Sequence, residues 1–543
     1  MNNTRPTTNT GRRTVLDTAH VGDIHGALGT IRSHHAPPRG RRRRLLALLA
    51  IMGPGLIVMV GDNDAGGVAT YAQAGQNYGL TLLWALLLLI PVLIVNQEMV
   101  VRLGAVTGVG HARLIIERFG KFWGAFSVGD LFILNFLTIV TEFIGVSLAL
   151  GYLGVSKYLS VPIAAVALVA MTATGSFRRW ERFMYLFVAT NFVAIPLVIA
   201  SHPHAGPIID HTLIPGVQGG LGSTSMLLII AIVGTTVAPW QLFFQQSNVI
   251  DKRITPKWIN YERADTIIGS FVVILGAGAL LIACAFAFSG SPLHGQFTDA
   301  GAVATGLARH LGPAAGDMFA LALLNASIIG AAAVTLASSY AFGDVFGRRH
   351  SLHHSAREAR AFHGSFAGLV ALAAAIVLIP GAPLGTMTTA VQALAGVLLP
   401  SATVFLVLLC NDKAVLGPWT NPGWLNALAA LIVGVLIVLS AILTATTLFP
   451  QVDVTLLAEA LFAALALALA AAGIYTRTGQ RRGNGAAQTE SVPREDWTMP
   501  QLELLERPVW SRTRIVGMYA LRGYLVLAVV MLIVKAIEVS VGQ

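Results

Sequence analysis

Within the first long apolar stretch of the chain, residues 53–67 read Gly-Pro-Gly-Leu-Ile-Val-Met-Val-Gly-Asp-Asn-Asp-Ala-Gly-Gly. This stretch places two carboxylates, Asp62 and Asp64, and the amide of Asn63 near the middle of a predicted membrane span. Glycines 66 and 67 weaken a helix, and Asp and Asn side chains compete for main-chain hydrogen bonds, so we predict a break here. Irregular backbone at membrane depth is tolerated only where it is buried or lines a cavity. Because no basic residue lies nearby in the span, the two carboxylates are a candidate cation site.

The composition of the whole chain indicates a polytopic membrane protein. Of its 543 residues, 55% are hydrophobic and 11% are charged, and the mean hydropathy is +0.70. The two cysteines, Cys284 and Cys410, exclude a disulfide scaffold and a cysteine-rich metal site. The net charge of +10 comes from short clusters of Lys and Arg between apolar runs. This is the positive-inside pattern of membrane proteins, so no nucleic-acid partner is predicted.

Twelve apolar segments approach or exceed the length of about 20 residues that crosses a bilayer. They are residues 45–78, 82–101, 124–150, 159–175, 183–201, 225–248, 265–289, 314–343, 364–380, 385–410, 424–449 and 453–474. Basic residues, Lys252 and Arg253 among them, concentrate in alternate loops, which predicts a cytosolic N-terminus. We therefore expect an integral protein of a bacterial inner (plasma) membrane, in contact with the lipid bilayer.

Four regions follow from this pattern. Residues 1–44 are polar and are expected to be a disordered cytosolic tail that ends in four arginines. Residues 45–475 are expected to form the membrane-spanning core, and residues 476–514 a polar cytosolic linker. Residues 515–543 contain a hydrophobic helix. We favour an additional span over 515–537, the alternative being a helix that lies in the membrane interface.

The sixth predicted span contains a second break, in the sequence Gly234-Thr-Thr-Val-Ala-Pro-Trp-Gln241. Pro239 removes a helix hydrogen bond and frees upstream carbonyl groups. Spans one and six each begin a half of five spans, and paired broken helices at matching places indicate an inverted-repeat transporter with a site near the midplane. The predicted fold is therefore an all-α, LeuT-like 5+5 inverted repeat with helices 1 and 6 broken. Freed carbonyls and Asp side chains are hard oxygen ligands, which suit Mg²⁺, Mn²⁺ or Ca²⁺.

Several motifs resemble the NRAMP family of divalent-metal transporters. The first span resembles that family in Gly53-Pro54-Gly55 and in Asp64-Ala65-Gly66-Gly67, where the family has Asp-Pro-Gly-Asn. The sixth span resembles the family's Met-Pro-His segment with Ala238-Pro239-Trp240. Further matches are Arg102-Leu103-Gly104, Glu142 with Gly145, and Gln392 with Pro400. The resemblance covers roughly residues 45–475, so this region is expected to be the transporter core.

The resemblance implies a metal site that combines both breaks with span ten. Its expected members are Gly61, Asp62, Asp64, Gly67, Thr235, Ala238 and Gln392. Gly67 stands where the family has Asn, Ala238 stands where it has Met, and Asp62 adds a carboxylate close to Asp64. Without the thioether sulfur, the site loses the ligand that favours transition metals over hard ions. A roomier and more acidic site suits Mg²⁺, which dehydrates reluctantly, so the pattern resembles the NRAMP-related magnesium transporter branch.

The resemblance also bears on the transport path and on proton coupling. The expected path residues are Asn63, Glu142, Trp240, Gln241 and Gln245. Trp240 and Gln245 occupy positions where the family has His, and an apolar isoleucine stands where it has an acid in span three. Because the usual chain of titratable groups is missing, we expect uptake that is not coupled to protons, with Glu142 as the remaining acid.

The predicted function is transport of divalent cations, Mg²⁺ first and Mn²⁺ second, with no enzyme activity and no cofactor besides the transported ion. Two transport alternatives stay open: a proton-coupled Mn²⁺/Fe²⁺ transporter, and an organic-solute (amino acid) transporter in which Asp62 and Asp64 bind an amine or Na⁺. An intramembrane aspartyl hydrolase fits poorly, because both acids lie on one strand of backbone. In the structural alternative, these polar groups bind no ligand and only cap the two half-helices at the break. The sequence leaves the oligomeric state open, and a monomer is the working expectation.

The remaining polar groups are expected to have ordinary roles. His202, His204 and His211 with Asp210 are expected to be solvated in a loop, and Asp130, Asp265 and Asp344 to cap helices or face water. Glu98 is expected either to line a vestibule or to make a structural hydrogen bond.

Overall fold

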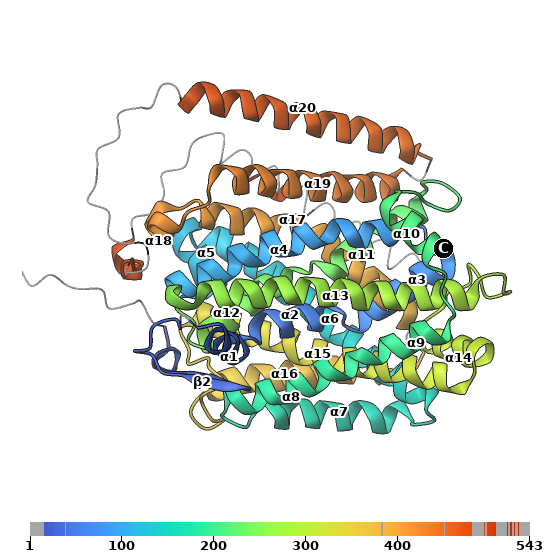
Figure 1. Ribbon diagram of the computed structural model, residues 1–543, viewed down its shortest axis with the longest axis horizontal. Coiled ribbons are helices and arrows are strands. Elements are labelled where there is room, and N and C mark those ends of the chain that lie inside the picture. The colour runs from blue at the N-terminus through green and yellow to red at the C-terminus, as the bar shows by residue number, and fades with distance from the viewer. Residues whose placement is uncertain are drawn as a thin grey trace, which may run out of the picture.

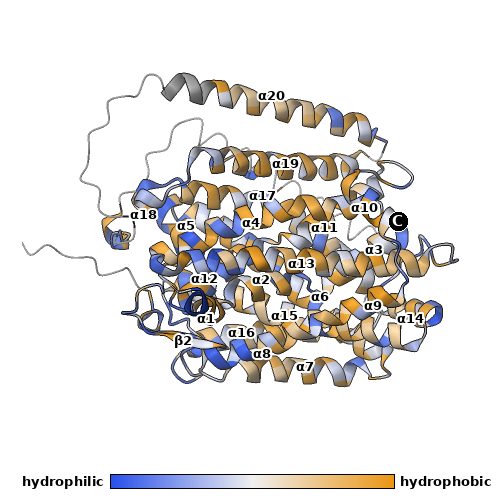
Figure 2. Ribbon diagram, viewed as in Figure 1, coloured by the Kyte–Doolittle hydropathy of each residue, from blue (hydrophilic) through white to orange (hydrophobic). Residues whose placement is uncertain are grey.

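The computed structural model describes residues 16–38, 40–381, 384–449, 451–480, 494, 497–505, 518, 519, 522, 523, 526 and 530. Most of the described chain is helical, and the long helices run side by side in one bundle (Figure 1). Figure 2 shows that apolar residues dominate these helices, whereas hydrophilic residues gather near α1, α5 and α18 at one end of the bundle.

The first predicted span bends once and breaks once. Helix α1 (Arg41–Ile51) is bent by 53° from α2 (Pro54–Asp62), and α3 (Ala65–Tyr78) begins after a break at two residues. The predicted break is therefore confirmed. The additional bend was not predicted; it occurs because Gly53 has a φ of +151° and Pro54 starts a new helix.

The rest of the first half follows without another break of this kind. It consists of α4 (Leu83–Thr107), α5 (His111–Phe119), α6 (Lys121–Tyr152), α7 (Lys157–Thr172), α8 (Phe177–Thr190), η2 (Asn191–Val193) and α9 (Ala194–Ala200). The short helix α10 (Ala205–Leu213) leads to the second half.

The second half begins with the second break. Two residues separate helix α11 (Ser223–Thr236) from helix α12 (Pro239–Asp251), which confirms the break predicted at Pro239. Then follow η3 (Pro256–Trp258), α13 (Ile259–Phe288), α14 (Ala300–Leu311), α15 (Pro313–Phe346), α16 (Arg360–Val377) and α17 (Leu384–Cys410). The chain continues through α18 (Lys413–Leu416), η4 (Gly417–Trp419), α19 (Gly423–Leu448) and α20 (Val454–Gln480).

All twelve predicted apolar segments contain helix, but their number as membrane spans stays a prediction. Among the described residues, ten helices are long and apolar enough to cross a membrane, or eleven if α1 and α2 form one bent span. Helix α7 has 16 residues and is shorter than the others.

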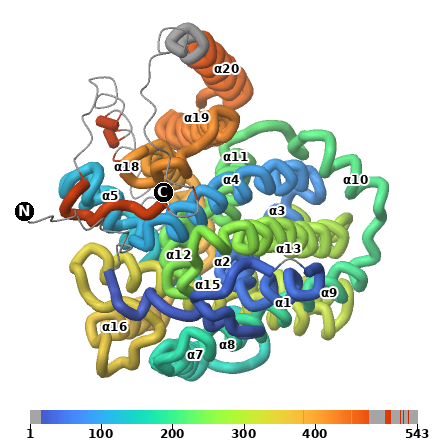
Figure 3. The backbone as a smooth tube through the Cα atoms, turned by 60° about the vertical axis from the view of Figure 1, so that its left-hand side comes forward, coloured from blue at the N-terminus to red at the C-terminus, as the bar shows by residue number. Residues whose placement is uncertain are grey.

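The packing places the two broken helices inside the bundle. Helices α6 and α15, one from each half, pack along each other, α11 packs on α17, and α13 packs on α2, α3 and α4. Helix α20 lies at the edge against α19 (Figures 1 and 3). The elements around the breaks therefore come from both halves of the chain.

The segment before α1 is ordered where the structure describes it. It contains η1 (Thr18–His20) and an antiparallel pair, β1 (Ile24–Gly26) and β2 (Gly29–Ile31). Asp17 accepts hydrogen bonds from the His350 backbone at 3.0 Å and from the His354 ring at 2.9 Å. Burial alone would raise the pKa of Asp17, but its hydrogen bonds, led by the one from Ala19, lower that pKa to about 2. Disorder over 1–44 is therefore wrong for the described residues, and residues 1–15 lie outside them.

The C-terminal predictions fall mostly outside the described residues. Helix α20 continues to Gln480, past the predicted start of the linker at 476. Later in the linker region, the Arg494 carbonyl accepts a hydrogen bond from the Trp419 indole at 2.7 Å, and η5 covers Leu502–Leu504. The helix predicted over 515–537 lies largely in residues that are not described and stays a prediction.

Candidate functional site

The first break holds two buried carboxylates. Asp64 is the N-cap of α3, and its Oδ1 accepts the N–H of Gly67 at 2.7 Å. Asp62 is the last residue of α2 and has no exposed surface. Within the described chain, neither carboxylate oxygen of Asp62 has a hydrogen-bond partner of normal geometry, although the Gln241 side chain and the N–H of Ala238 lie beside it. A buried carboxylate without partners is strongly unfavourable, so Asp62 needs a cation or a proton.

Glu142 of α6 belongs to the same cluster. Its Oε2 accepts the N–H of Ala65 at 3.1 Å, while its Oε1 has no partner among the described residues. A Cβ atom placed on Gly330 of α15 would lie 2.6 Å from Glu142 Oε2 and 2.8 Å from Asp64 Cβ. The absence of a side chain at 330 therefore lets the two acids lie close together. Glu142, predicted as a path residue, lies beside Asp64.

The two breaks meet at Gly67. A Cβ atom on Gly67 would lie 3.1 Å from the Asp62 carbonyl oxygen and 3.1 Å from Thr235 Oγ1. This hydroxyl is buried and has no partner in the part of the chain that the structure describes. Ala238, at the second break, is the N-cap of α12 and is also buried. The structure thus brings residues of both predicted breaks together.

Gln392 of α17 lies directly over the first turn of α3. A Cβ atom on Gly66 would lie only 1.7 Å from Gln392 Nε2. This amide nitrogen has no hydrogen-bond partner within the described residues. The predicted ligand from span ten is therefore at the break, and it is there because Gly66 has no side chain.

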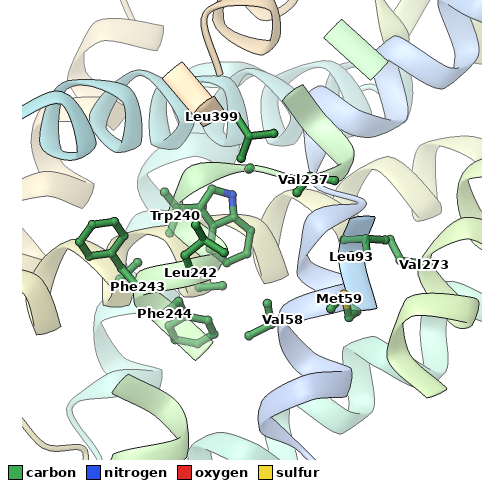
Figure 4. Close-up of a cluster of buried hydrophobic side chains, with 14 of the residues drawn as sticks. Val58, Met59, Leu93, Val237, Trp240, Leu242, Phe243, Phe244, Val273 and Leu399 are labelled. Atoms are coloured by element: carbon green, nitrogen blue, oxygen red, sulfur yellow. The ribbon is translucent and has the colours of Figure 1, made fainter. Parts of the chain in front are cut away.

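Trp240 packs against the end of α2. Its side chain is fully buried, and a Cβ atom on Gly61 would lie 3.6 Å from its Cη2. Figure 4 shows Trp240 beside the second break with Val58 and Val237 among its apolar neighbours. The predicted residues Gly61 and Trp240 are thus close to each other.

The other predicted path residues point toward α4 and α13. The Gln97 amide donates to Gln241 Oε1 at 2.9 Å, and the Gln245 amide donates to Thr266 Oγ1 at 2.9 Å. Asn63 donates to the Val273 carbonyl at 3.0 Å, so its side chain faces α13 and not the α6–α15 side that holds Glu142. Asn63 is therefore separated from the acidic cluster although it lies between Asp62 and Asp64 in sequence.

The chemistry of this site is that of hard oxygen ligands. Among the described residues, no group of three or more His, Cys, Asp and Glu side chains is arranged to hold a metal ion. A cation at the breaks would therefore combine carboxylate oxygens with amide, hydroxyl and backbone oxygens, as Mg²⁺, Mn²⁺ or Ca²⁺ accept. Cys284 and Cys410 are free and buried.

A buried ionic network at the start of α2 was missed by the sequence analysis. Lys252 Nζ lies 2.5 Å from Glu181 Oε1, both side chains are fully buried, and Lys252 also donates to the Met52 carbonyl at 2.8 Å. Asp265 accepts the N–H groups of Gly53 and Gly55 at 2.9 and 2.8 Å. Lys252 is thus not a solvated loop charge. Asp265 is a cap, as one expectation had it, but it caps α2 and is buried from water.

The network had no local signal in the sequence. Lys252 and Glu181 are 71 residues apart, and Gly53 and Asp265 are 212 residues apart. In the sequence, Lys252, Glu181 and Asp265 each lie near other charged residues at the end of a predicted span, which is the usual pattern of solvated loops.

The other polar candidates have structural partners. Glu98 forms ion pairs with Arg102 at 3.0 Å and Arg263 at 2.5 Å, which matches the structural alternative. Asp344 is buried and lies 3.0 Å from the His350 ring, so a water-facing position is wrong for it. Asp130 is half-buried. His204 stacks on Phe286. A loop position is wrong for Asp210 and His211, which lie in helix α10, and no metal-binding group of His, Cys, Asp or Glu occurs here among the described residues.

Comparison with known proteins identifies relatives over most of the chain. Residues 55–446 match the family described as natural resistance-associated macrophage protein-like, or Nramp. The chain is 30% identical over 406 residues to the divalent metal cation transporter MntH of Ralstonia nicotianae, which covers 70% of this chain and 87% of the relative. It is 28% identical over 444 residues to MntH of Xylella fastidiosa (strain Temecula1), covering 78% of this chain and 89% of the relative.

The structure is also similar to a solved transporter. A crystal structure of the Eremococcus coleocola manganese transporter, in complex with an aromatic bis-isothiourea substituted compound, aligns with a TM-score of 0.58 and 20% identity. The alignment covers 83% of this chain and 98% of that chain. At this identity the likeness shows the fold, and it confirms the predicted all-α, LeuT-like architecture.

The contact between Gly66 and Gln392 generates a prediction. The Gly66→Ala substitution should displace the Gln392 amide and weaken Mn²⁺ or Mg²⁺ binding by about tenfold or more, the range seen when groups around a metal are moved. Isothermal titration calorimetry on purified protein measures this change. The control is Gly129→Ala in α6, where a Cβ atom meets nothing within 4 Å. Equal affinities in the two variants would show that Gln392 is not part of the site.

Proposed function

The chain belongs to the Nramp family, and on that premise we propose that it carries divalent metal cations across the membrane through the site between its two broken helices. It is a transporter and not an enzyme. Its relatives in Ralstonia and Xylella are named divalent metal cation transporters. The observation that carries the proposal is Asp62, whose buried carboxylate has no hydrogen-bond partner of normal geometry among the described residues and lies in the same break as Asp64.

We propose Mg²⁺ as the preferred ion, with Mn²⁺ as the second. The support is chemical. Ala238 contributes no sulfur, whereas the Asp62 carbonyl and Thr235 Oγ1 lie beside Gly67, and the Gln392 amide lies beside Gly66. An oxygen-rich and sulfur-free site lowers the advantage of transition metals over Mg²⁺. We take Gly61, Asp62, Asp64, Gly67, Thr235, Ala238 and Gln392 as the proposed metal site.

We also propose that uptake is not coupled to protons. Trp240 and Gln245 of α12 carry side chains that do not titrate near neutral pH; Trp240 is fully buried, and the Gln245 amide donates to Thr266. Glu142 is the acid next to Asp64, and its Oε1 has no partner among the described residues, so a coupled, manganese-type mechanism would act through this group. Measuring proton movement during metal uptake distinguishes uncoupled from proton-coupled transport.

The proposed setting is a bacterial inner membrane with the N-terminus in the cytosol. The support is the concentration of Lys and Arg in alternate loops. In this orientation α1 and η1 lie on the cytosolic side, and α10 and α14 lie on the outer side. The proposed functional unit is the monomer, because the site is assembled from helices of one chain.

The first functional prediction concerns Asp64. The Asp64→Ala variant should lose divalent-cation uptake in proteoliposomes, because the break loses the carboxylate that holds the ion. Its elution on size exclusion and its helical circular dichroism should match the unmodified protein. Asp210→Ala, in the exposed helix α10, is the matched control and should transport normally. Full uptake by Asp64→Ala would contradict the proposed site.

The second prediction concerns ion selectivity. Ala238→Met combined with Gly67→Asn should raise the affinity for Mn²⁺ or Cd²⁺ relative to Mg²⁺, because thioether sulfur favours softer ions. Calorimetry with each ion gives the ratio of affinities. Ala238→Leu with Gly67→Asn is the control, since it fills similar space without sulfur. An unchanged Cd²⁺ to Mg²⁺ ratio in the Met variant would show that the missing sulfur does not set selectivity.

The third prediction concerns protons. In liposomes loaded with a pH dye and held at an inside-negative potential, Mg²⁺ or Mn²⁺ should enter while the internal pH stays constant. Uptake should respond to the potential, because each charge moved is worth about 2.3 kcal/mol per 100 mV. Empty liposomes and Asp64→Ala liposomes are the controls. Internal acidification that requires metal and scales with uptake would establish coupling.

A further inference from the structure

We propose that a cavity on the side of the bundle binds the hydrocarbon chain of a membrane lipid next to the first helix break. The cavity has a volume of about 600 Å³ and lies between α4, α9 and α13, with α2 at one end and α10 at the other. Apolar side chains such as Leu86, Val198 and Ile282 form most of its wall. We call it the lateral cavity.

The deep end of the lateral cavity is the break itself. Val60 and Asn63 line it there, and Asn63 is 5% exposed. The Asn63 amide nitrogen is bonded to the Val273 carbonyl, but its Oδ1 has no hydrogen-bond partner within the described residues. The cavity therefore reaches the backbone between Asp62 and Asp64 from the side of α13, away from Glu142.

The rim of the lateral cavity faces the medium around the bundle. Leu87, Ile195, Ile199 and Leu275 line it and are 39%, 53%, 65% and 71% exposed. These residues belong to α4, α9 and α13, helices of the membrane-spanning core. The surrounding medium is therefore lipid hydrocarbon. Apolar cavities of this kind exclude water and take up apolar ligands, so an acyl chain is the occupant that the lining favours.

Helix α10 indicates the leaflet from which the lipid would enter. Ile208 and Thr212 of α10 close the far end of the cavity, whereas Ile209 and Leu213 are exposed. Figure 3 shows this segment running along the outside of the bundle between α9 and α11. A short helix with exposed apolar residues beside polar ones is typical of an interfacial helix. In the proposed orientation, the lipid belongs to the outer leaflet.

Two glycines of α13 shape the cavity: Gly276 makes room for the Asn63 amide, and Gly278 leaves open space for the chain. A Cβ atom on Gly276 would lie 2.6 Å from Asn63 Nδ2, while a Cβ atom on Gly278 meets nothing within 4 Å. A hydrocarbon chain beside Gly278 would pack against Val60 at the end of α2, next to the break where the backbone is not helical. Its effect on transport rests on the proposed function, whereas the binding itself rests on the cavity alone.

The binding is tested with a lipid probe in nanodiscs and without any metal, so the result does not depend on transport. Phosphatidylglycerol that carries a diazirine near the end of one acyl chain is illuminated, and the labelled peptides are identified by mass spectrometry. Labelling should concentrate on the lining residues of α9 and α13. In Gly278→Phe it should fall by about tenfold, the change expected when several buried methylene contacts are lost.

The matched control is Gly368→Phe on α16, where a Cβ atom also meets nothing within 4 Å. This variant should keep the labelling of α9 and α13. Labelling that is spread evenly over all lipid-facing helices, or that is the same in Gly278→Phe, would overturn the proposal.

A second measurement does not need the bulky variant. Gly278→Cys is made in a chain that also carries Cys284→Ala and Cys410→Ala. A lipophilic maleimide should modify this thiol, and a charged, membrane-impermeant maleimide should not. Rapid reaction with the charged reagent would show that water fills the lateral cavity, which would overturn the proposal even if Gly278→Phe failed to fold.

Discussion

Backbone and carboxylate groups at membrane depth must be paired, and the rest of this structure depends on how the two helix breaks meet that constraint. At the first break, Asp64 pairs with the N–H of Gly67, and Glu142 pairs with the N–H of Ala65. The second break begins a new helix at Pro239, which has no N–H to leave unpaired. Asp62 is the exception, since its carboxylate has no hydrogen-bond partner of normal geometry in the described chain. A bound cation would satisfy it.

Small residues and buried charges hold these breaks in position. Gly66 and Gly330 allow Gln392 and Glu142 to approach the first break, and Gly234 brings α11 against the backbone of α17. At its other end, α2 is capped by Asp265 and lies beside the buried pair of Lys252 and Glu181. Helix α2 therefore has a firmly bonded start and an unpaired acidic end. Any movement of α2 during transport must break these hydrogen bonds or carry the bonded groups with it.

The site combines a family framework with its own chemistry. The proposed framework consists of the two breaks, Glu142 and Gln392, and all of these lie within residues 55–446, the range that matches the Nramp family. The departures are Gly67 and Ala238, which remove an amide and a sulfur, and Asp62, which adds a carboxylate. In the proposed site, the missing sulfur at Ala238 and the added carboxylate of Asp62 both favour hard, oxygen-liganded cations. The lateral cavity adds a further element, because it brings apolar surroundings to the opposite side of the same break.

The sequence by itself determined the membrane setting, the positions of both breaks and the residues around them. These features depend on local chemistry: Pro239 ends a hydrogen-bonded helix, and Asp64 followed by two glycines caps a new one. The tertiary structure alone decided that Asn63 faces α13, that Asp265 caps α2, and that the segment from residue 16 to α1 is ordered. The physical reason is that each of these depends on a partner far away in the chain. A hydrogen bond between residues separated by about two hundred positions leaves no periodicity or motif at either end, and only the packing of the helices brings its two groups together.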